Sequence, residues 1–130
     1  MRGVDGFSRK DNIYLMQLDD DQIAQFDEQG YLFFPGLLDQ DEAAVLQQAT
    51  PDLLNGQGPE VIREKDDPSA ARLVFGGHVN SEAFRRLVLL PRLLNPSRQL
   101  LRDEVYMHQS RMNPKQGFGE GASWDWHQDY

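Results

Sequence analysis

Apolar residues recur at helical spacing through most of this chain and alternate as in strands towards its end. The stretch LDDDQIAQFDEQG opens with an aspartate cluster, and carboxylates stabilise a helix N-terminus because unpaired amides and the positive end of the helix dipole lie there. Ile23 and Phe26 form one apolar stripe, and Gly30 is a typical C-terminal stop. The pattern predicts a helix up to Gly30, followed by a short strand over residues 31–34 that Pro35 ends.

The middle of the chain predicts a second helix, a loop and a strand. The helix begins near Asp39 and ends at about Thr50, because Pro51 has no amide hydrogen for an interior helical bond. Residues 55–68 are rich in glycine, proline and charged residues, which is typical of a loop. Residues 72–75, an arginine followed by three apolar residues, predict a strand, and a Gly-Gly pair ends it.

The remainder of the chain predicts two more helices and then strands. Ser81 is placed to cap a helix through Leu90, and Pro91 suits the first turn of the next one. The residues expected to be buried on that next helix are Leu93, Leu94, Leu100 and Leu101. Residues 104–113 and 124–130 predict two strands joined by a glycine-rich loop. Helices first and strands last predict an α+β or mainly β fold whose sheet has only begun.

Composition narrows the class of protein. The 130 residues are 39% hydrophobic and 26% charged, as in a globular domain, and no cysteine is present to form a disulfide or a thiolate metal site. No apolar run is long enough for a membrane span, and the polar N-terminus does not resemble a signal peptide, so we expect a cytoplasmic protein with no membrane partner. The net charge of -8 lies mainly in residues 1–60, which hold 12 acidic and 3 basic residues. This acidity argues against nucleic acid as a partner.

The stretch WDWHQDY at residues 124–130 carries the strongest candidate chemistry. In a strand, side chains i and i+2 point to the same face, so His127 and Asp129 project together, with Asp125 one step behind. An imidazole and a carboxylate can hold adjacent positions on a divalent metal, as in the two-histidine, one-carboxylate set of non-heme iron oxygenases. An H-x-D pair also arises often by chance, so the pair on its own leaves the metal site open.

The predicted strand before it, residues 104–113, adds polar groups. Alternation places Gln109, Arg111 and Asn113 on one face. The other face carries Tyr106, His108 and Ser110. Gln109 and Asn113 are neutral amides whose N–H groups suit a carboxylate or keto oxygen, although they would equally serve a sheet edge or the following loop.

Two segments resemble the phytanoyl-CoA dioxygenase superfamily, in the order that the family has them. VYMHQSRMNPKQGFGEGASWDWHQDY resembles its HQSR-x-N-x-K strand and loop followed by W-H-x-D, most closely in the ectoine-hydroxylase-like members. QIAQFDEQGYLFFPGLL resembles the family's opening helix and its GY-x-x-x-PG-L turn. The resemblance runs from about residue 18 to the end and is weakest over residues 51–80. We therefore expect residues 1–17 to be a polar lead-in and residues 18–130 to be the N-terminal part of one domain, truncated after the H-x-D motif.

The resemblance implies a fold and a set of site residues. The fold is the N-terminal half of a double-stranded β-helix, or jelly roll, with flanking helices and an incomplete sheet. His127 and Asp129 are implied to be two of the Fe(II) ligands. The residues implied to bind the co-substrate 2-oxoglutarate are Gln109, Asn113 and Trp124.

The family's second histidine ligand and the arginine that binds the distal carboxylate of 2-oxoglutarate lie further downstream than this chain extends. His108 faces away from the candidate co-substrate residues. His78, which follows the Gly-Gly pair, is expected in a surface loop, and a place near a substrate entrance is the alternative. Neither histidine is a convincing replacement. We therefore expect the 130-residue chain by itself to be inactive.

These implications predict a 2-oxoglutarate-dependent dioxygenase that hydroxylates a small polar molecule resembling ectoine or an amino acid. An alternative is an inactive fragment that acts at most as a binding or assembly module and self-associates through uncovered sheet edges. A divalent-metal hydrolase is a third reading, but it lacks a general base and explains neither Gln109 nor Asn113.

Overall fold

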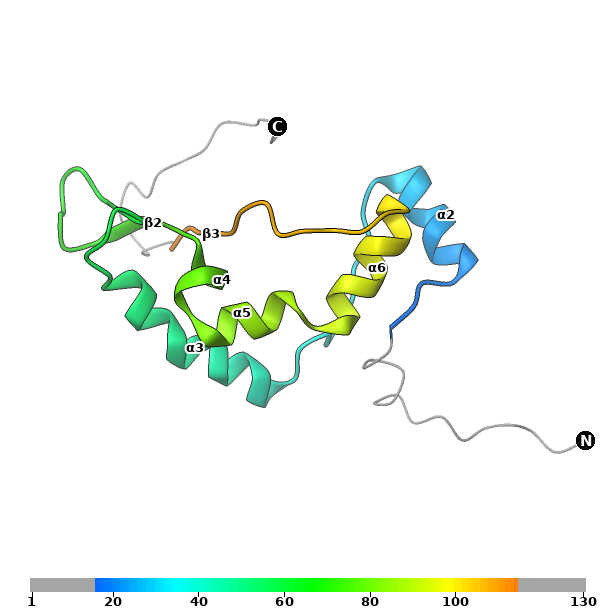
Figure 1. The fold of residues 1–130 in the computed structure, drawn as a ribbon, viewed down its shortest axis with the longest axis horizontal. Helices are drawn as coiled ribbons and strands as arrows, with labels where there is room; N and C mark the ends of the chain where they lie inside the picture. Colours follow the sequence, from blue (N-terminus) through cyan, green and yellow to red (C-terminus); the bar gives the residue numbers. More distant parts are fainter. Residues whose placement is uncertain (1–15, 115–130) are drawn as a thin grey trace, which may run out of the picture.

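The computed structural model describes residues 16–114, which form several helices and, towards one end, a small antiparallel sheet (Figure 1). In chain order the elements are α2 (Asp20–Gln29), α3 (Gln40–Leu54), β1 (Val61–Arg63), β2 (Ala71–Phe75), α4 (Gly77–Asn80), α5 (Glu82–Val88), α6 (Pro91–Leu101) and β3 (Arg111–Met112). This mixture agrees with the predicted α+β class. None of the helices within residues 16–114 combines the length and the apolar character that a transmembrane span requires.

The first two helices begin with the same capping arrangement. Asp19 accepts a hydrogen bond from the backbone N–H of Gln22 at 2.8 Å, and the Gln22 side chain accepts one from the Asp19 N–H at 3.1 Å. Asp39 and Glu42 repeat this reciprocal pair at the start of α3. Each pair satisfies two amides that a helix N-terminus leaves unpaired, which is why α2 and α3 begin where the sequence predicts.

Helix α2 also ends as predicted, at Gly30, whose φ of 80° lies in the left-handed region. Helix α3, however, continues through Pro51 to Leu54, so the prediction that it ends before the proline is wrong. Thr50 Oγ1 donates to the Leu46 carbonyl at 2.8 Å, and the Asn55 N–H donates to the Pro51 carbonyl at 2.9 Å, so the turns on either side of the proline stay bonded. The added turn buries Leu53, and that burial offsets the cost of an interior proline.

The sheet has the order β1-β2-β3, and both pairs of strands are antiparallel. Strand β2 confirms the prediction for residues 72–75. Strand β1 lies inside residues 55–68, so the prediction of a continuous loop there is wrong. The three residues of β1 pair with β2 along most of the length of β2. This pairing supplies β1 with hydrogen bonds that its local sequence does not reveal.

Two other strand predictions are wrong. Residues 31–34 form no strand, and Tyr31 and Phe33 are exposed. Of residues 104–113, only Arg111 and Met112 pair with the sheet. A strand requires a neighbour to accept and donate its backbone hydrogen bonds, and residues 31–34 and 104–110 have no such ladder within the described part of the chain.

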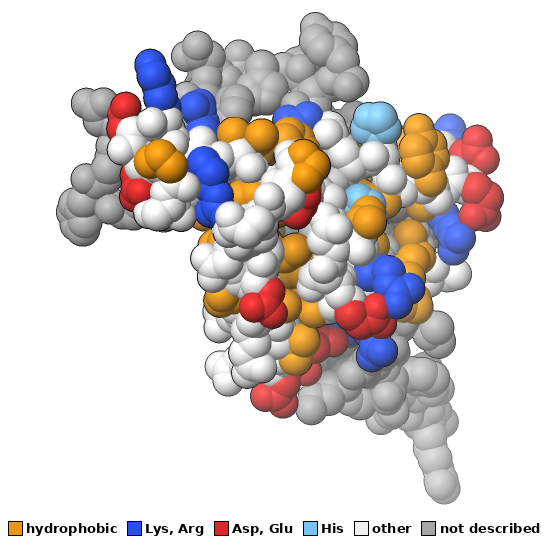
Figure 2. All heavy atoms as spheres, turned by 60° about the vertical axis from the view of Figure 1, so that its left-hand side comes forward, with side chains coloured by type: hydrophobic (Ala, Val, Ile, Leu, Met, Phe, Trp, Pro, Cys, Tyr) orange, Lys and Arg blue, Asp and Glu red, His pale blue; other side chains and the backbone are white. Residues whose placement is uncertain are grey.

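The core lies between the sheet and the C-terminal turns of α3. Leu53, Val61, Ala71 and Val74 are buried together, and Val74 is only 1% exposed. The side chains that pack against this cluster are Leu54, Phe84 and Met112. Figure 2 shows other apolar side chains exposed at several separate places, between charged groups.

Helix α6 begins at Pro91 as predicted, but of the residues expected to be buried on it, Leu93, Leu94 and Leu100 are half-buried and Leu101 is exposed. Arg92, 3% exposed, and Pro96 are its buried residues, whereas Leu101 is 69% exposed. The Arg92 guanidinium donates to the carboxylate of Glu42, which belongs to the capping pair of α3. A buried charge needs a partner, and this ion pair fixes the start of α6 against the start of α3.

A side chain also anchors the segment before α2. The Leu18 N–H donates to Gln99 Oε1 at 2.7 Å, and Gln99 Nε2 donates to the Leu18 carbonyl at 3.1 Å. Gln99 thereby pairs with Leu18 as a neighbouring strand would. The bond joins residues 81 positions apart and holds α2 near α6, at one end of the molecule in Figure 1.

Arg63 of β1 binds the end of α3. Its Nη1 donates to the carbonyls of Leu54 at 3.0 Å and Ser69 at 3.2 Å, and its Nη2 donates to the Gly56 carbonyl at 2.6 Å. The last carbonyls of a helix have no partner within the helix and lie at the negative end of its dipole, so a guanidinium is well suited to them. Arg63 therefore joins α3, β1 and the loop between β1 and β2.

Candidate functional site

The predicted metal ligands, His127 and Asp129, lie outside the described residues, as does Trp124. Their positions therefore remain predictions from the sequence. Within residues 16–114 no group of three histidine, aspartate or glutamate side chains is arranged to hold a metal ion. The described part of the candidate site is the stretch from Gln109 to Asn113, around β3.

Gln109 has a defined orientation on the exposed side of this stretch. Its Oε1 accepts a hydrogen bond of 3.3 Å from Arg111 Nε, which agrees with the predicted placement of the two side chains on one face. Because Oε1 is the acceptor in this contact, the Nε2 group of Gln109 is the part that can donate to a ligand. Asn113 is half-buried at the end of β3 and takes part in an interaction of its own.

The three residues predicted on the opposite face differ in their exposure to solvent. Tyr106 and His108 are exposed, and their rings meet edge to face with centroids 6.3 Å apart. Ser110 is half-buried, and its Oγ lies 2.7 Å from Nδ1 of His78. The expectation that His78 occupies a surface loop is wrong, since this residue is half-buried in the one-turn helix α4.

Gly76 makes the approach of α4 to Ser110 possible. It has a φ of 66°, in the left-handed region, which turns the chain from β2 directly into α4. Its N–H donates to the Ser110 carbonyl at 3.0 Å. The Gly-Gly pair in the sequence indicated a break after β2, but nothing in it indicated that the next residue would contact a serine 32 positions later.

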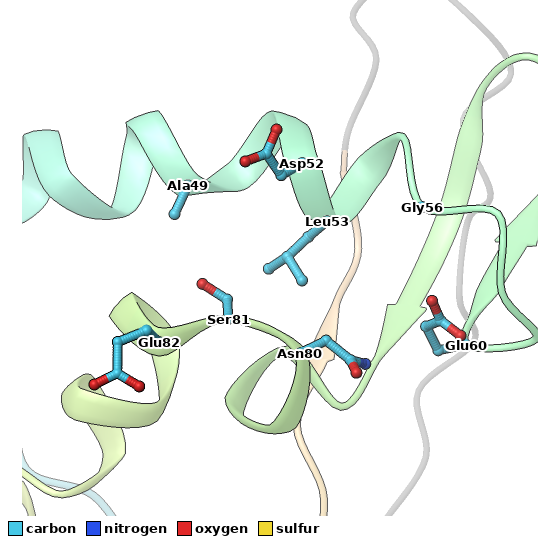
Figure 3. A pocket seen from close by; sticks show the side chains of 8 residues that line it. All are labelled: Ala49, Asp52, Leu53, Gly56, Glu60, Asn80, Ser81 and Glu82. Carbon is cyan, nitrogen blue, oxygen red and sulfur yellow. The ribbon is translucent and has the colours of Figure 1, made fainter.

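A cavity of about 380 Å³ lies between the C-terminal turns of α3 and the α4–α5 corner (Figure 3). Its lining includes the acidic residues Asp52, Glu60 and Glu82 and none of the predicted site residues. Hydrogen bonds from Arg86 and then Arg85 lower the pKa of Glu82, so this group stays ionised. The residues that line this cavity include no lysine, arginine or histidine, so it offers a dicarboxylate no cationic partner and is not suited to 2-oxoglutarate.

A second hollow, of about 450 Å³, has mainly apolar walls. It lies between α5, α6 and the extended segment after α6, and it contains Leu101 and Tyr106, which are 69% and 83% exposed. It also contains none of the predicted site residues.

Comparison with known proteins assigns the chain to a family. The family model described as phytanoyl-CoA dioxygenase (PhyH) matches residues 26–130. An ectoine dioxygenase of Bordetella bronchiseptica is 39% identical over 114 residues, covering 85% of this chain and 36% of that protein. An L-proline trans-4-hydroxylase of Streptomyces griseoviridis is 37% identical over 110 residues, covering 85% of this chain and 40% of that protein.

The fold is also similar to solved structures of EctD from S. alaskensis, at 35% sequence identity and over 74% of this chain and 35% of that one. The TM-score is 0.67 for the structure with 2-oxoglutarate and 5-hydroxyectoine and 0.68 for the structure with bound Fe. The chain thus spans little more than a third of the length of the relatives that it matches. Since the family model covers most of the chain and both sequence and fold agree with its members, the chain belongs to the phytanoyl-CoA dioxygenase family.

Proposed function

We propose that this chain is the N-terminal part of an Fe(II)- and 2-oxoglutarate-dependent dioxygenase that hydroxylates a small polar substrate, resembling ectoine or an amino acid. The observation that carries the proposal is the likeness in sequence and fold to EctD, which has been solved with Fe and with 2-oxoglutarate and 5-hydroxyectoine. The name of the proline hydroxylase relative supports a substrate of amino-acid size.

In this proposal His127 and Asp129 hold the iron, and Gln109, Asn113 and Trp124 contribute to the 2-oxoglutarate site. The described residues fit an anionic co-substrate, because residues 109–113 contain no acidic side chain and present a cation and two amides. The Gln109 amide is oriented by Arg111, which leaves its N–H groups to bind a carboxylate oxygen. The iron, when bound, supplies the oxidation chemistry, and the protein supplies orientation and a polar site of suitable charge.

The same proposal places residues 1–17 in a lead-in and residues 18–130 in a jelly-roll domain that a longer polypeptide completes. That polypeptide would supply the second histidine ligand and the arginine for the distal carboxylate. We also propose a cytoplasmic enzyme with a small molecule, and neither nucleic acid nor a membrane, as its partner.

Anaerobic addition of Fe(II) and 2-oxoglutarate should produce a visible metal-to-ligand charge-transfer band with the complete polypeptide and no band with the 130-residue chain. The band requires the keto acid to bind directly to a redox-active metal held by the full ligand set. Absorbance titration measures it, and Zn(II), which has a filled d shell, is the control that should give no band. A complete polypeptide that binds both components without a band would contradict the proposed function.

A second candidate is an assembly module without catalysis, and the exposed apolar walls of the 450 Å³ hollow favour it. Apolar surface of this kind promotes association when no other segment covers it. We expect the 130-residue chain to self-associate with increasing concentration and the complete polypeptide to do so less. Sedimentation velocity of the two measures this, and a monomeric 130-residue chain at all concentrations would exclude the module.

A further inference from the structure

We infer that His78 is a positioning residue for the co-substrate site: by binding Ser110 it fixes the strand segment that carries Gln109 and Asn113. This inference rests on the proposed function and adds to the co-substrate site a residue that lies outside the segment from Gln109 to Asn113. His78 itself has no predicted contact with iron, co-substrate or substrate.

Three hydrogen bonds converge on Ser110 from one turn of the chain. Its Oγ lies 2.7 Å from His78 Nδ1 and 3.4 Å from the backbone nitrogen of His78, and its carbonyl accepts the Gly76 N–H at 3.0 Å. Side chain and backbone of a single residue are thus held by the start of α4. Gly77, between the two donors, is buried, and a Cβ built on it would lie 3.9 Å from the same Oγ, so the two segments are in close contact.

The backbone pairing beside Ser110 is short. Only two pairs of residues join β2 to β3, Val74 with Met112 and Phe75 with Arg111. Within the described part of the chain, residues 105–109 form no hydrogen bond to β1, β2 or a helix. Ser110 is therefore a point at which a long extended segment, orange in Figure 1, is joined to the turn between β2 and α4, directly before its two pairs with β2.

The position of Ser110 makes this junction relevant to the site. Gln109 precedes it directly, and Asn113 follows the two paired residues of β3. A shift of the segment at Ser110 moves both amides together, and recognition of a small dicarboxylate depends on donors held to within a fraction of an ångström. His78 therefore acts on co-substrate affinity through geometry.

The first experiment measures the junction without iron or co-substrate, by hydrogen exchange in the 130-residue chain. His78→Leu and Ser110→Ala should each raise the exchange rate of the Gly76 amide about tenfold, as expected for loss of one net hydrogen bond. His78→Asn should restore most of the protection, because its amide can place a polar atom near the position of Nδ1. Val79→Ala, at an exposed position of the same helix, is the matched control and should change nothing.

Protection of the α3 amides reports whether each variant is still folded. If His78→Leu also loses the protection of the α3 amides, that variant is unfolded. The inference is then tested by the exchange rate of the Gly76 amide in Ser110→Ala and in His78→Asn. Unchanged Gly76 exchange in Ser110→Ala would overturn the inference. An effect of Val79→Ala equal to that of the His78 variants would overturn it too, since the whole helix would then be responsible.

The second experiment measures 2-oxoglutarate binding to the complete polypeptide with Fe(II), through the charge-transfer band. The His78→Leu and Ser110→Ala variants should each raise the Kd about tenfold, and the double variant should raise it no further, because both remove the same interaction. The His78→Asn variant should approach the unchanged protein, and the KM for the hydroxylated substrate should change less than the Kd for 2-oxoglutarate. Additive effects in the double variant would overturn the inference. A missing band in the unchanged protein would instead contradict the proposed function, and the exchange experiment would still test the junction.

Discussion

Replacing Asp129 with glycine should reduce hydroxylation by the complete polypeptide to below detection. The carboxylate is the proposed anionic ligand of the iron, and its removal leaves two neutral imidazoles and an open position. The family resemblance implies that related halogenases lack a carboxylate at this position, so that a halide can bind the metal there. If the proposed function is correct, Asp129 favours hydroxylation over halogenation and also contributes to metal affinity.

Product formation with a small polar substrate such as ectoine or proline, together with iron content after dialysis, measures this effect. The matched control is Asp125→Gly, which removes a carboxylate four positions earlier in the same predicted strand. It should retain iron and activity. If Asp125→Gly abolishes hydroxylation while Asp129→Gly does not, the ligand assignment is wrong.

Replacing Arg63 with methionine should lower the free energy of unfolding by about 2–4 kcal/mol, since the charged donor of three hydrogen bonds is lost. Methionine preserves much of the aliphatic volume, so the loss reports on the guanidinium and not on packing. The carbonyls of Leu54 and Gly56 at the end of α3 would then depend on water. A domain with so small a buried core has little stability to spare.

Urea denaturation followed by circular dichroism measures this change. Arg63→Lys should recover only part of the loss, because an ammonium cannot span three carbonyls as a planar guanidinium does. Arg98→Met removes an exposed arginine that pairs with Glu104, and it should cost less than about 1 kcal/mol. Equal losses for Arg63→Met and Arg98→Met would show that the carbonyl contacts of Arg63 contribute nothing.

The features that the sequence determined by itself are those that depend on near neighbours. Asp19 with Gln22 and Asp39 with Glu42 are three positions apart, and their capping pairs each lie within one turn of helix. The left-handed stop at Gly30 is local in the same way. The motif around Gln109 and Asn113, with the H-x-D pair beyond it, identified the family before any fold was known.

Tertiary structure decided the features that need a distant partner. β1 exists because β2 pairs with it, α3 continues through Pro51 because the added turn buries Leu53, and Arg92 is buried because Glu42 neutralises it. The contact of His78 with Ser110 spans 32 positions and follows no periodicity that a sequence displays. Hydrogen bonds and charges across the fold are satisfied only once its elements pack together. For this reason the sequence predicted the chemistry of a site, while the folded chain determined which distant residues contact one another.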